Sequence, residues 1–179
     1  NDTLTAGAGD DQLNGGIGND VLAGGTGADT IDGGAGADTL DYSSSAEGVT
    51  LNLATNSGSG GDATGDYFLN MENVLGSNFG DSLTGDSGAN LLDGSAGNDT
   101  LVGGAGADTL IGGTGNDTSD YSGSTQAVTI DLATGTGSGG DAQGDTFSGI
   151  ESLFGTDFND RLGGDNSANL LSGGMGNDT

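Results

Sequence analysis

The sequence predicts an all-β fold, a parallel β-roll (β-solenoid) in which short strands stack into two facing sheets. Two observations predict it. A nine-residue pattern recurs with glycine at its first, second and fourth positions, an acid or amide at its sixth and an aliphatic residue at its eighth. The sequence also repeats with a longer period of 79 residues, because residues 15–93 align with 94–172 without a gap. Such repeats are typical of solenoids, whose units stack on their neighbours.

The nonapeptides form three blocks, and we expect the domain boundaries to follow them. The blocks span residues 1–41, 76–120 and 155–179, and the segments between them, 42–75 and 121–154, are 34-residue inserts. Each 79-residue unit thus holds five nonapeptides and one insert, which indicates tandem duplication. Because the terminal nonapeptides are cut in mid-repeat, we expect a longer array that continues beyond residue 179.

Within one nonapeptide, the first six residues predict a tight loop and the last three a short strand. Glycine permits a positive φ and a close approach of backbone, as such a loop requires. The last three residues, such as Thr39-Leu40-Asp41, alternate polar, apolar and polar, which is typical of a strand with one face inward. Two units would close one coil of 18 residues, and stacked coils would give two parallel sheets with leucines between them.

The inserts should add strands of their own. Segments 49–53 and 128–132 alternate in hydropathy and predict half-buried strands, whereas NSGSGGDATGD at 56–66 predicts a loop. We expect Tyr42 and Tyr121, which begin the inserts, to cover an exposed end of the roll. The five phenylalanines are predicted to be core plugs or caps: Phe68, Phe79, Phe147, Phe154 and Phe158.

Composition excludes several classes of function. Aspartate and glutamate number 27 against the single cation Arg161, which gives a net charge of −26 and excludes nucleic acid and anionic membrane as partners. Without histidine, cysteine or lysine the chain has no nucleophilic triad, imidazole proton transfer or thiolate metal site. No apolar run approaches transmembrane length. We therefore predict no catalytic residue, no other cofactor-binding residue and no enzyme here, with a catalytic domain elsewhere in the full-length protein left open.

The predicted core is too thin to hold the fold alone. One leucine per nonapeptide contributes roughly 1.5–3 kcal/mol, whereas ordering nine residues costs on the order of 10 kcal/mol. Position-six side chains 18 residues apart should lie one above the other, where two carboxylates about 5 Å apart repel by roughly 3 kcal/mol. A divalent cation would reverse that sign, and an all-oxygen environment favours Ca²⁺ over Mg²⁺.

The segments GGIGNDVLA, GGTGADTID, GGAGADTLD and GGAGADTLI resemble the nonapeptide of RTX (hemolysin-type calcium-binding) proteins, and nonapeptides cover nearly two thirds of the chain. The resemblance implies type I secretion and a Ca²⁺-bound parallel β-roll outside the cell. The implied metal ligands are the position-six side chains: Asp2, Asp11, Asp20, Asp29, Asp38, Asp81, Asn90, Asp99, Asp108, Asp117, Asp160, Asn169 and Asp178. Carbonyls of loop glycines would complete the sites: Gly16, Gly18, Gly25, Gly27, Gly34, Gly36, Gly104 and Gly106. We expect roughly seven to nine ions from the pairing of these side chains.

Some nonapeptides depart from the pattern. Position four is Phe79, Phe158 or Ser167 in three loops, which weakens the expectation of a site there. Asn90 and Asn169 keep an oxygen at position six but lose the charge, so weaker binding is expected.

The inserts supply further acids. Glu72 and Glu151 fall at position six, 18 residues before Asn90 and Asn169, and we interpret them as ligands that restore the missing charge. A solvated acid on a strand edge is an alternative of equal weight. Four more insert acids could form further sites or solubilise a loop, and we favour solubility: Asp62, Asp66, Asp141 and Asp145.

We favour a bacterial extracellular calcium-binding module in a structural or adhesive surface or filament protein. Its partners would be calcium ions and either like copies or cell-surface components, without membrane insertion. The alternative is a C-terminal calcium-binding secretion and folding module of a secreted enzyme or toxin. Ice binding, which some rolls of this type perform with a regular Thr/Asn file, is disfavoured because position three reads Ala8, Ile17, Thr26 and Ala35.

Overall fold

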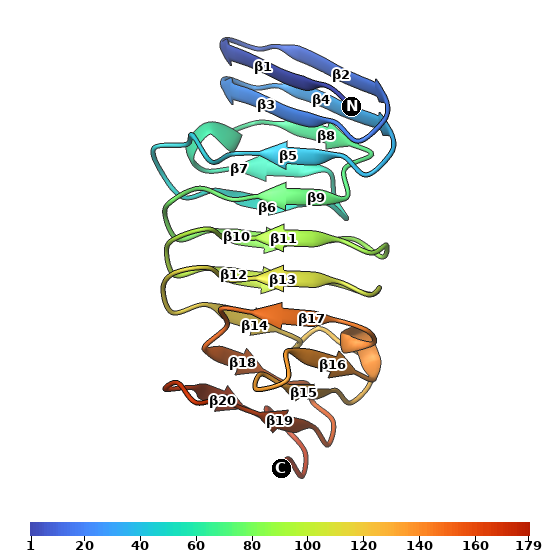
Figure 1. Cartoon of the computed structure of the whole chain (residues 1–179), viewed down its shortest axis with the longest axis vertical. Coiled ribbons are helices and arrows are strands. Elements are labelled where there is room, and N and C mark those ends of the chain that lie inside the picture. The colour runs from blue at the N-terminus through green and yellow to red at the C-terminus, as the bar shows by residue number, and fades with distance from the viewer.

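The computed structural model describes residues 1–179 as an elongated stack of short strands in two facing ten-stranded sheets (Figure 1). The only other elements are two single 3₁₀ turns, η1 (Gly61–Ala63) and η2 (Gly140–Ala142). No helix is long and apolar enough to span a membrane. The all-β roll predicted from the nonapeptides is therefore confirmed.

The first sheet runs in the order β1 (Thr3–Ala8), β3 (Val21–Thr26), β5 (Thr39–Asp41), β9 (Asn73–Leu75), β11 (Leu91–Asp93), β13 (Thr109–Ile111), β17 (Thr146–Ser148), β16 (Thr136–Ser138), β15 (Thr129–Asp131) and β19 (Arg161–Gly163). The second runs β2 (Gln12–Ile17), β4 (Thr30–Ala35), β8 (Tyr67–Leu69), β7 (Ser57–Ser59), β6 (Thr50–Asn52), β10 (Ser82–Thr84), β12 (Thr100–Val102), β14 (Thr118–Asp120), β18 (Ser152–Phe154) and β20 (Leu170–Ser172).

The register of the strands confirms the 18-residue coil. Leu4 pairs with Leu22 in the first sheet and Leu13 with Ile31 in the second, all in parallel. Val74 pairs with Leu92, so the end of the first insert re-enters the nonapeptide phase as predicted.

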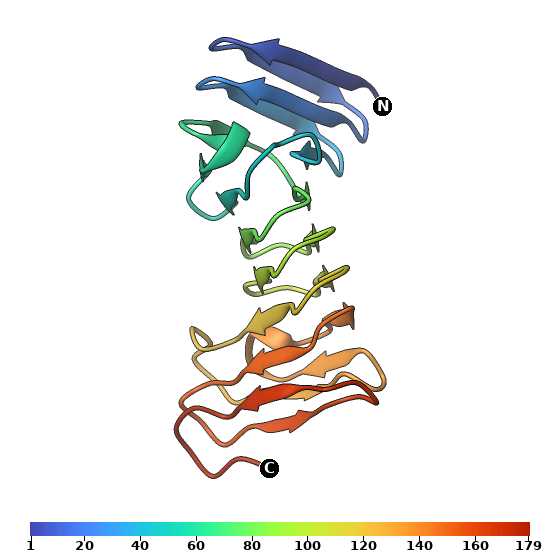
Figure 2. The same ribbon diagram turned by 90° about the vertical axis from the view of Figure 1, so that its left-hand side faces the viewer.

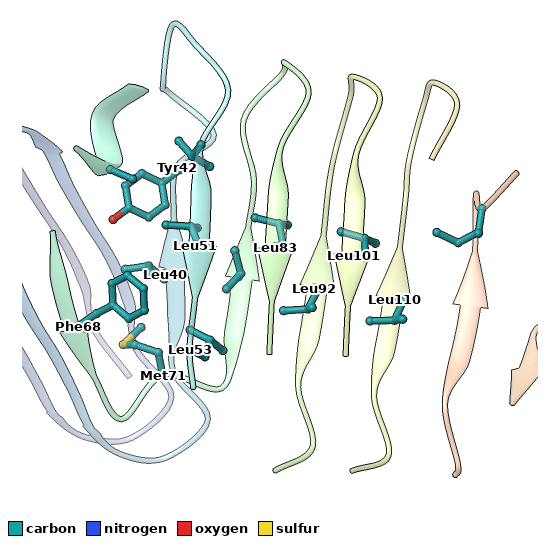
Figure 3. Packing of buried hydrophobic residues seen from close by; sticks show 14 of the residues in the cluster. Leu40, Tyr42, Leu51, Leu53, Phe68, Met71, Leu83, Leu92, Leu101 and Leu110 are labelled. Carbon is teal, nitrogen blue, oxygen red and sulfur yellow. The ribbon is translucent and has the colours of Figure 1, made fainter. Parts of the chain in front are cut away.

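The core is a narrow file of aliphatic side chains between the sheets. Leu83 and Leu101 from the second sheet alternate with Leu92 and Leu110 from the first, and all four are fully buried (Figure 3). Position eight of the nonapeptide therefore supplies the core side chain of these strands, as the alternation predicted, whereas β14 has Ser119 at this position.

The inserts contain strands that the sequence did not predict. The segment 56–66, expected to be a loop, contains β7 and η1, and β7 lies antiparallel between β6 and β8. Hydropathy could not indicate β7 because its central residue, Gly58, has no side chain; a Cβ there would lie 3.1 Å from the Cβ of Ala63. In the second insert β16 repeats this arrangement between β15 and β17.

The two inserts lie on opposite sheets. The first adds β6, β7 and β8 to the second sheet, whereas the second adds β15, β16 and β17 to the first. Successive nonapeptide strands alternate between the two sheets. Because five nonapeptides, an odd number, separate the first insert from the second, the second insert begins from the opposite sheet. Accordingly η1 and η2 lie on opposite sides of the stack in Figure 1, and Figure 2 shows the same stack from its side.

The aromatic residues only partly follow the prediction. Tyr42 (Figure 3) and Tyr121 are buried within the inserts and do not cover an end of the roll, so that prediction was wrong. Phe68 and Phe147 are core residues as expected. The remaining three are 38–47% exposed, because they lie in loops or on the outer strand face, away from the file of core residues: Phe79, Phe154 and Phe158.

Candidate metal centres

The position-six side chains form a ladder at each edge of the roll. In each rung the backbone N–H of one residue donates to the carboxylate Oδ1 of the residue one coil later, as from Asp11 to Asp29 at 2.9 Å. All seven predicted pairs stack in this way: Asp2/Asp20, Asp11/Asp29, Asp20/Asp38, Asp81/Asp99, Asn90/Asp108, Asp99/Asp117 and Asp160/Asp178.

The glycine loops stack against each other as closely as the carboxylates. Gly34 has a φ of 98°, and a Cβ on it would collide with the carbonyl oxygen of Gly16 one coil earlier. At position one the reason for glycine differs, because a Cβ on Gly15 would lie 2.6 Å from Asp20 Oδ2. All the glycines predicted to offer carbonyls lie in these loops with positive φ: Gly16, Gly18, Gly25, Gly27, Gly34, Gly36, Gly104 and Gly106.

Six ladder carboxylates are buried with one oxygen unpaired. Their Oδ1 atoms accept a backbone N–H, but their Oδ2 atoms have no hydrogen-bond partner. A buried carboxylate oxygen without a partner is strongly destabilising, and a cation would satisfy it. The donor set therefore fits a metal ion at six positions: Asp20, Asp29, Asp38, Asp99, Asp108 and Asp117.

No side chain neutralises these carboxylates. The chain's one ion pair joins the N-terminal amine of Asn1 to Asp20 Oδ1 at 3.4 Å. Burial is the main cause that raises the pKa of Asp99 and of Asp108 to about 6, and it also raises the pKa of Asp117. Ionised carboxylates are thus disfavoured in this fold unless a cation compensates them.

Each candidate site offers few acids. No three acidic side chains converge on one point. A bound ion would therefore take most of its ligands from neutral oxygens, which the stacked loop carbonyls can provide. Oxygen donors in flexible loops are typical of Ca²⁺, which takes about 6–8 oxygen ligands.

The other predicted position-six ligands lack an open oxygen or lie in outer coils. Ser77 donates its N–H to Asp81 Oδ2 at 2.7 Å and its hydroxyl to Oδ1 at 2.8 Å, and Thr156 closes Asp160 in the same way. These are the loops of Phe79 and Phe158, where a site was least expected. Three further residues occupy the outermost coils, where they are exposed or half-buried: Asp2, Asp11 and Asp178.

The two asparagines are also poor candidates by geometry. The Asn90 oxygen accepts the N–H of Asp86, and its amide nitrogen donates to the carbonyl of Glu72 at 3.1 Å. Asn169 leaves a buried amide nitrogen without a partner, and that donor would repel a cation.

The insert acids extend the ladders. Glu72 Oε2 accepts the N–H of Asp38 at 2.9 Å, so its carboxylate extends toward Asp38 and not toward Asn90. Glu151 does the same for Asp117, away from Asn169.

Two more insert acids are ladder members that the sequence reasoning missed. Asp66 and Asp145 are buried, and their Oδ1 atoms accept the N–H groups of Asp29 and Asp108. The favoured interpretation of Asp66 and Asp145 as solubilising acids was therefore wrong. Asp62 and Asp141, in contrast, are partly exposed and lie in the 3₁₀ turns η1 and η2. No spacing of 18 residues leads to Asp66, because 37 residues separate it from Asp29.

A second ladder at position five was also missed. The Asn19 side-chain oxygen accepts the N–H of Ala37, and Asn98 does the same for Asn116 at 2.9 Å. The recurrence of Asn-Asp at positions five and six, as in Asn19-Asp20, was the available signal.

Comparison with known proteins identifies the repeat. A family model described as the RTX calcium-binding nonapeptide repeat (four copies) matches residues 1–22, 14–44, 75–110, 84–119 and 145–179, which together make up more than half of the chain. A comparison with curated proteins found no match.

Proposed function

Because this chain belongs to the family of RTX calcium-binding nonapeptide repeat proteins, we propose that it is a secreted module whose coils order on Ca²⁺ within a bacterial structural or adhesive surface or filament protein. Its calcium-binding character follows from the family, and the repeat domain is a structural, non-catalytic module. Secretion and adhesion are the parts that we propose.

One observation supports the role of calcium in folding above all others: the six buried Oδ2 atoms without a partner. We propose Asp20, Asp29, Asp38, Asp99, Asp108 and Asp117 as the carboxylate ligands, with loop carbonyls beside them. The bound cation would neutralise buried charge that the chain leaves uncompensated. This count favours about six ions, fewer than the seven to nine expected from pairing alone.

Calcium titration tests the proposal. We expect isothermal titration of metal-stripped protein to give about six sites and circular dichroism to show a gain of β signal with Ca²⁺ but little with Mg²⁺. A metal-stripped chain with unchanged β signal and thermal stability would contradict it.

The alternative, a folding module attached to a secreted enzyme or toxin, depends on the same calcium chemistry. The tandem 79-residue duplication favours an array, since it lengthens the stack without creating a distinct site. Electron microscopy of the native full-length protein would separate the two. A regular lattice or filament supports the array, whereas dispersed monomers carrying a catalytic domain support the alternative.

A further inference from the structure

Four ladder carboxylates have both oxygens hydrogen-bonded by the protein, with a side-chain hydroxyl among the donors. Tyr42 donates its hydroxyl to Asp66 Oδ2 at 2.6 Å, and Tyr121 does the same for Asp145. Ser77 and Thr156 close Asp81 and Asp160 with a hydroxyl and a backbone N–H. We call these four positions hydroxyl-closed rungs. None of their carboxylate oxygens is among the unpaired buried atoms.

The hydroxyl-closed rungs occupy equivalent places in the two units. In the strand order β8-β7-β6-β10, Asp66 directly precedes β8 and Asp81 directly precedes β10. In the order β17-β16-β15-β19, Asp145 precedes β17 and Asp160 precedes β19. Each antiparallel insert is therefore bracketed by two closed rungs, and the open carboxylates lie outside the brackets.

The carboxylates at the insert boundaries are tied directly to insert backbone or side chains. Asp81 Oδ1 also accepts the N–H of Val49, which leads into β6, and Asp160 Oδ1 accepts the N–H of Val128, which leads into β15. Ser45 holds η1 by accepting the N–H of Asp62 at 3.1 Å. These bonds need no metal ion.

The inserts also have a thicker core than the coils. Around Leu40 the first insert adds several buried side chains that pack together in Figure 3: Tyr42, Leu51, Leu53, Phe68 and Met71. A regular coil offers one leucine or isoleucine per strand. Since burial of each such side chain contributes roughly 1.5–3 kcal/mol, the inserts have an apolar contribution that the coils lack.

We propose that each insert, with its two hydroxyl-closed rungs, is a calcium-independent folding nucleus on which the calcium-dependent coils order. This inference rests on the proposed function for the coils and adds that the ladders contain two kinds of rung. The metal-stripped chain would then keep two ordered islands, 42–85 and 121–164, separated by disordered coils.

Hydrogen exchange of the full chain in metal-stripped buffer tests this directly. We expect amides of β6, β8, β15 and β17 to exchange at least about 100-fold more slowly than those of β3, β4, β12 and β13. On adding Ca²⁺, the second group should become protected as well. Uniformly fast exchange before calcium and protection everywhere after it would overturn the nucleus and leave the calcium function intact. Uniform protection before calcium would overturn both.

Hydroxyl deletions identify the cause of the protection. We expect Tyr42→Phe combined with Tyr121→Phe, and separately Ser77→Ala combined with Thr156→Ala, to reduce calcium-free protection of the islands at least about tenfold. Ser87→Ala is the matched control, because Ser87 is an exposed hydroxyl in a loop of the calcium-dependent block. Islands that survive both double variants unchanged would contradict a role for the closed rungs.

A gain-of-site variant gives an independent readout. Ser77→Gly combined with Phe79→Gly restores glycines at positions two and four and removes the hydroxyl that is bonded to Asp81 Oδ1. Glycine at position 77 also permits the positive φ that Gly25 and Gly34 have at this position, which would turn the backbone N–H of residue 77 away from Asp81 Oδ2. We expect about one additional calcium ion per chain by titration. If the variant keeps its fold in calcium but binds no additional ion, the hydroxyl is not the group that keeps the metal out of this rung.

Discussion

A buried carboxylate with one hydrogen-bonded and one unpaired oxygen destabilises the fold when no cation is present and stabilises it when a cation binds. Asp99 illustrates this, because its Oδ1 accepts the N–H of Asp81 while its Oδ2 has no partner. Spacing alone predicted that such residues would stack. It could not predict which of them remain open, because the closing groups lie elsewhere: Tyr42 is 24 residues before Asp66 and carries no local signal. Serine at position two of the loop is no signal either, because Ser77 closes Asp81 whereas Ser95 stands at the same position in the loop of the open Asp99.

Substitution of Asp99 should therefore change stability in two directions. We expect Asp99→Asn to lower the melting temperature in calcium, because a ligand is lost, and to preserve or raise residual structure without calcium, because a buried charge is removed. Thermal melts followed by circular dichroism in both conditions measure this. Asp157→Asn, at an exposed loop position, is the control that should change neither. An equal loss in both conditions would show that Asp99 has only a structural role.

The same burial predicts an acid-stabilised metal-free state. Asp99 and Asp108 have pKa values of about 6 in the fold, raised above the ordinary 3.8 mainly by burial. Between pH 4 and 6 the folded state therefore binds more protons than the unfolded state, and the free energy of unfolding falls as pH rises. We expect the metal-free β signal to be greatest near about pH 4 and to decline by about pH 6–7. A calcium-free signal that instead grows with rising pH would contradict this assignment.

Calcium binding should show the opposite dependence on pH. Because the ion requires the ionised carboxylate, its affinity should weaken below about pH 6 and each binding event should release protons there. Titrations in buffers of different ionisation enthalpy at about pH 5.5 and pH 7.5 would measure the release.

At the scale of elements, hydropathy predicted the position-eight strands of the nonapeptides. It missed β7 and β16, which place no large side chain in the core, and also β8 and β17, which place Phe68 and Phe147 there. Leu92 in β11 and Leu101 in β12 stand at position eight and are fully buried, so the alternation located their strands correctly. The antiparallel β7 has no large side chain at its centre and is held by backbone pairing with β6. Pairing of this kind depends on residues that fold back from a distance, which a local pattern does not record.

The thin core makes each leucine of the file important. We expect Leu92→Ala to lower the free energy of unfolding in calcium by about 2–5 kcal/mol, because its strand is held in register by pairing with β9 and β13 and the neighbouring core side chains cannot move in to fill the cavity. Denaturant unfolding in saturating calcium measures the loss. Ile17→Ala is a useful control, since Ile17 is 88% exposed and should change stability little. Equal effects of the two substitutions would contradict the importance of the core file.

At the scale of the whole molecule, the net charge of −26 opposes compaction unless cations offset it. Monovalent salt at 1 M shortens the screening length to about 3 Å, but it does not supply ligands for the buried oxygens. We expect salt alone to reduce the radius of gyration of the metal-free chain, which lies below the value of about 45 Å for a fully unfolded chain of this length, without adding β signal, whereas Ca²⁺ should change both. Small-angle scattering together with circular dichroism would test this, and recovery of the full β signal in potassium chloride would contradict it.

The placement of the inserts on opposite sheets has a mechanical consequence. Each insert adds two more strands to its own sheet than one ordinary half-coil would, which lengthens that side by about 10 Å at the usual spacing between strands. The second insert lengthens the other side equally, so the bend introduced by one is cancelled by the other. Removing one nonapeptide, such as residues 94–102, would place both inserts on the same side and turn a straight rod into an arc.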